Sequence, residues 1–214
     1  MDALRYTLLS DGSSDQALVP ILTWLLRTQG ANGAIQPEWA DLRRLPRPPH
    51  TLSERINCSL ELYPCDVFFV HRDAEGVLPF ARTEEIHQAL ATVAQRVQVP
   101  PTVHVVPVRM QEAWLLFDEK AIRSAAGNPH GRASLVLPPL NTLEQLPDAK
   151  RVLYDLLREA SGLTGRRRKQ FRVRTRARRV AEFVNDFSPL RTLCAFRKLE
   201  ADVRQVADAH GWNQ

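Results

Sequence analysis

Acidic residues follow three apolar runs of the sequence, at positions where carboxylates could share a divalent cation. Carboxylates that converge without a nearby lysine repel one another unless a cation neutralises them, and Mg²⁺ and Mn²⁺ prefer oxygen ligands of this kind. Such a cation can orient a phosphate group, stabilise developing charge and activate a water molecule. The residues that we expect to hold Mg²⁺ or Mn²⁺, and to carry the chemistry, are Asp11, Asp73, Glu75 and Glu112.

Each of these acids also has an ordinary structural explanation. The pair Asp11-Gly12 could simply turn the chain into the helix that follows, with a serine as its cap. Glu112 could be a first-turn acid that favours the helix dipole, and the acids at 73 and 75 could lie on a solvated loop. Four neighbouring residues could hydrogen-bond to the cation ligands and hold them in position: Asp15, His71, Arg72 and Asp118. Each could instead have a purely structural role, for example as a helix-start acid, a helix cap or a hydrogen-bonded histidine.

The elements that would position these acids alternate between strands and helices. Strand-like runs cover residues 5–9, 66–70 and 103–108, and a short edge strand is expected near 39–42. Helical patterns cover residues 13–29, 52–62, 83–97, 148–160, 177–187 and about 199–209. This alternation predicts an α/β fold with a mostly parallel sheet flanked by helices. Functional groups gather beyond the carboxyl ends of such strands, where these acids are expected to lie.

The chain divides by composition into an α/β part and a basic, helical part. We expect an α/β domain at residues 1–126, a loop or lid rich in Pro, Gly and Asn at 127–147, and a basic α-helical part at 148–214 packed on the same domain. Residues 166–214 hold 13 Lys/Arg and 5 Asp/Glu, a net charge of +8, whereas the preceding residues carry −3. This asymmetry is typical of a protein with a phosphate-bearing partner.

One segment, residues 166–179, contains nine Lys/Arg and no acid. A charge run usually forms a solvated face, but nine like charges repel one another unless an anion lies near. The phosphates of DNA or RNA are the expected anion, through contacts independent of base sequence. An acidic patch on a partner protein is the alternative. The expected nucleic-acid-binding residues are Arg166, Arg167, Arg168, Lys169, Arg172, Arg174, Arg176, Arg178 and Arg179.

Composition also argues against several other classes of protein. No apolar run approaches the ~20 residues that a membrane span needs, and the N-terminus lacks the residue order of a signal peptide. Cys58, Cys65 and Cys194 form no C-x-x-C pair, which predicts reduced thiols, no zinc site and a cytoplasmic protein. The phosphate-loop pattern G-x-x-x-x-G-K-[ST] is absent, so ATP chemistry would need a partner protein.

Three motifs in order resemble the TOPRIM fold of topoisomerases, primases and nucleases related to the overcoming-lysogenization-defect family. "VFFVHRDAEG" is similar to the strand and acidic pair of that fold, with Asp73 and Glu75 in the acid positions and a glutamate where a second aspartate is usual. "LLSDGSSD" is similar to its first motif, with Asp11 where glutamate is usual. "PVRMQEAWLLFD" and "SPLRTLCAFRKLE" resemble signatures of an uncharacterised TOPRIM-like bacterial family that is often encoded beside ATPases.

The resemblance implies a metal-dependent nuclease that hydrolyses phosphodiester bonds in DNA or RNA, with an ATPase partner and a role in phage defence. In that function Asp73, Glu75 and Glu112 would hold the cation, and Asp11 would be a ligand or the general acid/base. The alternative is a non-catalytic subunit that binds nucleic acid or an ATPase and keeps only a degenerate site. A small-molecule phosphotransferase or phosphohydrolase would use the same carboxylates. Homo-oligomerisation is left open by the sequence.

Overall fold

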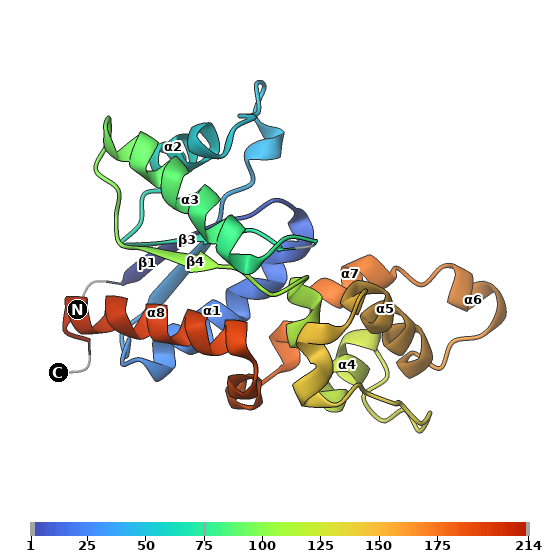
Figure 1. The fold of residues 1–214 in the computed structure, drawn as a ribbon. Coiled ribbons are helices and arrows are strands. Elements are labelled where there is room, and N and C mark those ends of the chain that lie inside the picture. The colour runs from blue at the N-terminus through green and yellow to red at the C-terminus, as the bar shows by residue number, and fades with distance from the viewer. Residues whose placement is uncertain (1–2, 75, 213–214) are drawn as a thin grey trace.

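The sheet at the centre of the protein has four strands, all parallel, in the order β2-β1-β3-β4. The computed structural model describes residues 3–74 and 76–212 (Figure 1). The strands are β1 (Leu4–Leu9), β2 (Ile35–Trp39), β3 (Val67–His71) and β4 (Thr102–Val105). The protein is therefore an α/β protein, as the alternation of strand and helix patterns predicts, and β3 lies inside the sheet with every residue buried.

Helices connect the strands and then continue beyond the last one. The α-helices are α1 (Leu18–Thr28), α2 (Leu52–Leu62), α3 (Pro79–Ala94), α4 (Glu119–Ala126), α5 (Ala149–Ala160), α6 (Gly165–Lys169), α7 (Val173–Arg178) and α8 (Cys194–His210). Short 3₁₀ helices are η1 (Ser13–Ala17), η2 (Leu42–Arg44), η3 (Gln111–Leu115), η4 (Leu140–Gln145), η5 (Val180–Phe183) and η6 (Ser188–Thr192).

The two faces of the sheet bury different side chains because successive strand residues point in opposite directions. Val67 and Phe69 of β3 belong to a core that also contains the buried residues of α1 and α8. Phe68 and Val70 belong to a smaller core with the buried residues of α2 and α3. Figure 1 shows the corresponding layers, with α2 and α3 on one side of the sheet and α1 and α8 on the other.

A group of helices extends the larger core beyond the carboxyl ends of the strands. There α4 packs against α5, α7 and η5, while η1 and η3, which follow β1 and β4, contact α7 and α5 (Figure 1). The last helix, α8, returns to the sheet and contacts β4 and α1. The basic segment, residues 166–179, thus lies in the chain between β4 and α8. Its helix α7 contacts η1, which follows β1.

Several element boundaries differ from those expected. The segment 13–29 begins as the 3₁₀ helix η1 before α1, and the edge strand lies at 35–39, ahead of the expected 39–42. Helix α3 begins at Pro79, a residue suited to the first turn because its missing N–H needs no partner there. Helix α8 begins at Cys194, where the carboxylate of Glu144 accepts hydrogen bonds from the free backbone N–H groups of the first turn. No helix in the described part of the chain is long and apolar enough to cross a membrane.

Candidate functional site at the carboxyl edge of the sheet

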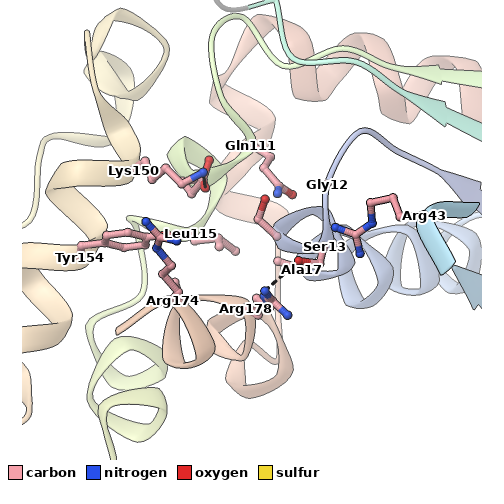
Figure 2. A pocket seen from close by; sticks show the side chains of 13 residues that line it. Gly12, Ser13, Ala17, Arg43, Gln111, Leu115, Lys150, Tyr154, Arg174 and Arg178 are labelled. Atoms are coloured by element: carbon pink, nitrogen blue, oxygen red, sulfur yellow. Dashed lines mark hydrogen bonds and ion pairs between the residues drawn. The ribbon is translucent and has the colours of Figure 1, made fainter. Parts of the chain in front are cut away.

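A pocket of about 480 Å³ opens at the carboxyl edge of the sheet, where η1, η3, α5 and α7 meet. We call it the sheet-edge pocket. Figure 2 shows Lys150 and Tyr154 reaching it from α5, Arg174 and Arg178 from α7, and Gln111 from η3. Its lining is completed by Gly12, Ser13, Ser14, Ala17, Arg43, Glu112, Leu115 and Ala177. The pocket therefore combines groups that directly follow the strands with cations from the helices beyond them.

Asp15 is the carboxylate that the loop after β1 buries behind this pocket. Asp15 is 4% exposed. Its Oδ2 accepts a hydrogen bond from the backbone N–H of Gly12 at 2.8 Å, and its Oδ1 accepts bonds from Ser14 Oγ at 2.9 Å and Gln111 Nε2 at 2.8 Å. Asp15 thus closes the first turn of η1 and ties it to η3. Gly12 itself is extended, at φ −139°, so its backbone conformation does not require glycine.

Gln111 links the loops that follow three strands, and one of its polar atoms has no partner. Its backbone N–H donates to Asp73 Oδ1 at 3.1 Å, and its side-chain amide donates to Asp15. Since a carboxylate can only accept, the bond to Asp15 fixes the orientation of the amide. The Oε1 atom of Gln111 is then buried without a hydrogen-bond partner in the described residues. A buried oxygen of this kind is usually satisfied by a hydrogen-bond donor such as an ordered water molecule, or by a cation.

His71, at the end of β3, lies between two carboxylates and is 1% exposed. Its Nδ1 lies 2.8 Å from the carbonyl oxygen of Val105 and must donate there, because a carbonyl only accepts. The opposite nitrogen, Nε2, lies 3.4 Å from Asp73 Oδ1 and 4.0 Å from Asp15 Oδ2. Burial acts to lower the pKa of His71, but the hydrogen bond and charge of Asp73, with Asp15 and Val105, raise it overall. The two carboxylates therefore favour the protonated imidazole more than burial alone would allow.

Glu112 is buried beside Lys150 of α5. The Glu112 residue is 4% exposed, and its Oε1 lies 3.2 Å from Lys150 Nζ. Burial raises the pKa of Glu112 and the charge of Asp73 raises it further, while Lys150 opposes the change. Burial acts to lower the pKa of Lys150, yet Glu112 and other neighbours raise it overall. Asp73 lies near Glu112 along the chain of contacts, because its Oδ1 accepts a hydrogen bond from the backbone N–H of Gln111, the residue before Glu112.

The structure places the other predicted acids differently. Asp11 is half-exposed and pairs with Arg55 Nη1 at 2.6 Å and Arg72 Nε at 3.0 Å, so two guanidinium groups already neutralise it. Asp118 caps α4, where its Oδ1 accepts from the backbone N–H of Ala121 at 3.0 Å. Glu75 lies outside the described residues.

Arginines of the basic segment divide between the sheet-edge pocket and other surroundings. Arg174 and Arg178 line the pocket, and Arg178 Nη2 donates to Ser13 Oγ at 2.8 Å (Figure 2). Arg179 pairs with Glu182 at 2.9 Å. The four basic residues of α6, Arg166 to Lys169, are exposed and line no part of the sheet-edge pocket. Figure 1 shows α6 at the end of the molecule farthest from the sheet.

The structure adds pocket residues that the sequence did not single out. Gln111 directly precedes the predicted ligand Glu112, and that adjacency is its only sequence signal. Lys150 and Tyr154 are spaced one helical turn apart on α5, a spacing that any amphipathic helix shows. Arg43, in the loop after β2, lies at the pocket rim and pairs with Asp41 at 2.9 Å.

A divalent cation at this edge of the sheet would have few protein carboxylates as ligands among the described residues. Within residues 3–74 and 76–212, no group of three or more His, Cys, Asp or Glu side chains is arranged to hold a metal ion. Mg²⁺ is commonly held by one or two carboxylates together with water and substrate phosphates, so three protein carboxylates are not required. The oxygen groups that could contribute to such a smaller set are the carboxylates of Asp73 and Glu112 and the unpartnered Oε1 of Gln111.

Comparisons with models of known protein families, with curated protein sequences and with solved structures find no match to this chain.

Proposed function

We propose that the protein is a Mg²⁺- or Mn²⁺-dependent hydrolase of phosphodiester bonds in DNA or RNA. The observation that carries the proposal is the sheet-edge pocket, in which the carboxylate of Glu112 and several basic side chains line the same space. Glu112 lines it together with Lys150, Arg174 and Arg178, and Asp73 accepts a hydrogen bond from the backbone N–H of Gln111, the residue before Glu112. Hydrolysis of a phosphodiester needs both kinds of group, since the substrate is anionic and its transition state carries further charge.

In this proposal Asp73 and Glu112 hold the cation, and Gln111 Oε1 is a third oxygen donor. When bound, the cation would orient the phosphate and lower the pKa of an attacking water molecule. Lys150, Arg174 and Arg178 bind the phosphate oxygens and keep the ester at the pocket floor. His71 positions Asp73 from behind, with its Nε2 3.4 Å from Asp73 Oδ1.

The TOPRIM-like assignment belongs to the same proposal. The parallel sheet and the acid after β3 support it, and Asp15 is a second acid after β1 that is buried and hydrogen-bonded to Gln111. The proposal also includes a cytoplasmic location, an ATPase partner and a role in phage defence. The free thiols of Cys58, Cys65 and Cys194 suit a reducing compartment.

The test is a cleavage assay on plasmid DNA, single-stranded DNA and RNA, each with Mn²⁺, Mg²⁺ or EDTA. We expect cleavage with metal, and a loss of about 100-fold or more for Asp73→Asn and for Glu112→Gln, because each removes a charged ligand. Asp118→Asn is the matched control, since asparagine can still cap α4. Full activity in the Asp73 and Glu112 variants would exclude the proposed site.

A second candidate function is favoured by one observation: the protein's own cations already pair with most of these acids. Asp11 pairs with two arginines, Glu112 with Lys150, and Asp73 with His71. A non-catalytic subunit that binds nucleic acid, or an acidic surface of an ATPase, would need the cations of the pocket but no metal. Tight oligonucleotide binding in EDTA, together with no cleavage under any metal, would favour this function over hydrolysis.

A further inference from the structure

A second pocket, of about 490 Å³, lies at the junction of α6 and α7, away from the strands. We call it the distal pocket. Its lining includes Arg167, Arg172, Arg176 and Arg179, together with Phe171 and Thr175. No carboxylate belongs to this lining, whereas the sheet-edge pocket contains Glu112. A concave surface with several guanidinium groups and no acid in its wall is suited to phosphate.

The positions of these arginines follow from helical geometry. An α-helix turns 100° per residue, because it has 3.6 residues per turn. Arg174 and Arg178 therefore share one face of α7 and line the sheet-edge pocket. Arg172, Arg176 and Arg179 lie on the opposite side of the helix and line the distal pocket.

The remaining face of α7 is apolar and anchors the helix. Val173 and Ala177 of α7, and Val180 at the start of η5, are buried in the larger core. Helix α7 is therefore held by packing while its two cationic faces stay accessible. The pockets are separated by one helix, whose diameter with side chains is about 10 Å.

The cations of the distal pocket differ in how far the protein already neutralises them. Arg179 pairs with Glu182, and Arg176 Nη1 donates to the carbonyl oxygen of Ala125 at 3.4 Å. Arg167 and Arg172 are exposed, and neither has a carboxylate partner within the described residues. Two uncompensated guanidinium groups beside each other repel unless an external anion lies between them.

We propose that the distal pocket is a second phosphate site, and that a single nucleic-acid strand bound in the sheet-edge pocket continues across α7 into it. The proposal rests on the proposed function and names its substrate class, single-stranded DNA or RNA. A pocket of about 480 Å³ accommodates a nucleotide-sized group. A single strand can bend over a helix, whereas a duplex resists bending over a length of about 150 base pairs. Phosphates on both sides of α7 then neutralise both of its cationic faces.

The test measures binding in EDTA, so that no cleavage interferes. Fluorescence anisotropy is recorded with labelled single strands of about two and about twelve nucleotides, the longer within the usual site size of single-strand-binding domains. The variant is Arg167→Gln/Arg172→Gln. Its matched control is Arg96→Gln/Arg132→Gln, which makes the same charge change at exposed arginines outside the basic segment and outside both pockets.

We expect the distal variant to weaken binding of the longer strand about tenfold and to reduce the slope of log affinity against log salt by about 1.4, since two phosphate contacts are lost. Binding of the dinucleotide should stay within about twofold, because it occupies the sheet-edge pocket alone. The control should change either affinity by less than about twofold. Equal losses in the two variants, or no loss in the distal variant, would overturn the second site.

Binding and cleavage assays on the wild type and the distal variant distinguish this proposal from the hydrolysis proposal. If the distal variant loses long-strand affinity while the wild type cuts no substrate with Mn²⁺, the second phosphate site stands and the hydrolysis proposal fails. If the wild type cuts and the distal variant binds and cuts the longer strand as the control does, only the second site fails. Tighter binding of a duplex than of the same-length single strand would overturn the assigned substrate class.

Discussion

The two sides of the sheet-edge pocket are built by different means. On the side of the strands, Asp15, His71 and Gln111 are each less than 5% exposed and are joined by hydrogen bonds and close contacts. On the helical side, Arg174 and Arg178 are exposed and Lys150 keeps 42% of its side chain accessible. The first side is fixed by long-range bonds, whereas the second presents long flexible cations.

This difference suits the two sides of the pocket to different roles. Groups that must hold a cation or reacting atom need a fixed geometry, which buried hydrogen-bonded networks supply. Groups that attract a phosphate backbone act mainly by charge and tolerate freedom of position. We therefore expect substitutions on the strand side to affect stability strongly, and substitutions on the helical side to affect mainly binding.

The largest effect on stability should come from Asp15→Ala. The substitution leaves the N–H of Gly12 and the amide of Gln111 without their acceptor, and a buried unsatisfied group costs about 1–3 kcal/mol. We expect the free energy of unfolding to fall by about 3 kcal/mol in urea titrations followed by circular dichroism.

The matched substitution is Asp11→Ala, four residues earlier in the same loop. Asp11 is half-exposed, and exposed ion pairs contribute about 0–1 kcal/mol. Its effect on unfolding should lie within that range. Similar losses for the two variants would show that burial does not distinguish these aspartates, and the contrast between fixed and exposed groups would fail for this loop.

These two aspartates also show what the sequence could and could not predict. The apolar runs and their order predict a mostly parallel sheet, and the structure confirms an all-parallel one. The sequence also predicts that acids follow the strands. Which aspartate of the 11–15 loop becomes buried depends on Gln111, 96 positions away, and on Arg55, 44 positions from Asp11. Contacts with partners so distant in sequence cannot be predicted from local periodicity.

The helical side was harder to predict for a related reason. Helix α2 has the bounds that its pattern predicts, since an amphipathic face is a local signal. The arrival of α5 and α7 at the sheet edge depends instead on how α4 and η5 pack with them. The charge run predicts an anionic partner, but only tertiary structure divides its arginines between two pockets.

A smaller effect is expected for Lys150→Met, and its size should depend on pH. The substitution leaves Glu112 buried without its cation, so we expect a loss of about 1 kcal/mol near pH 7.5, with metal removed by EDTA. The penalty exists only while Glu112 is ionised. Burial raises the pKa of Glu112, so lowering the pH through that raised pKa protonates the group and removes the penalty.

Urea titrations at about pH 7.5 and about pH 4.5 would measure this change, the lower value being near the ordinary pKa of glutamate. In a Glu112→Gln background, Lys150→Met should cost little at either pH, because no buried charge remains to be compensated. A penalty that is equal at both pH values, or that persists in that background, would show that Lys150 contributes by packing rather than by pairing with Glu112.

The smallest effect on stability is expected for Arg178→Gln. The exposed guanidinium donates to Ser13 Oγ at 2.8 Å, and the loss of such a surface contact changes unfolding by less than about 0.5 kcal/mol. Phosphate binding should respond more clearly, since Arg178 lines the sheet-edge pocket. We expect dinucleotide affinity to fall several-fold. The slope of log affinity against log salt should decrease by the amount expected for the loss of about one phosphate contact. If unfolding changed as much as in Asp15→Ala while affinity stayed constant, Arg178 would be part of the fixed framework, and the helical side would be structural rather than adapted to a ligand.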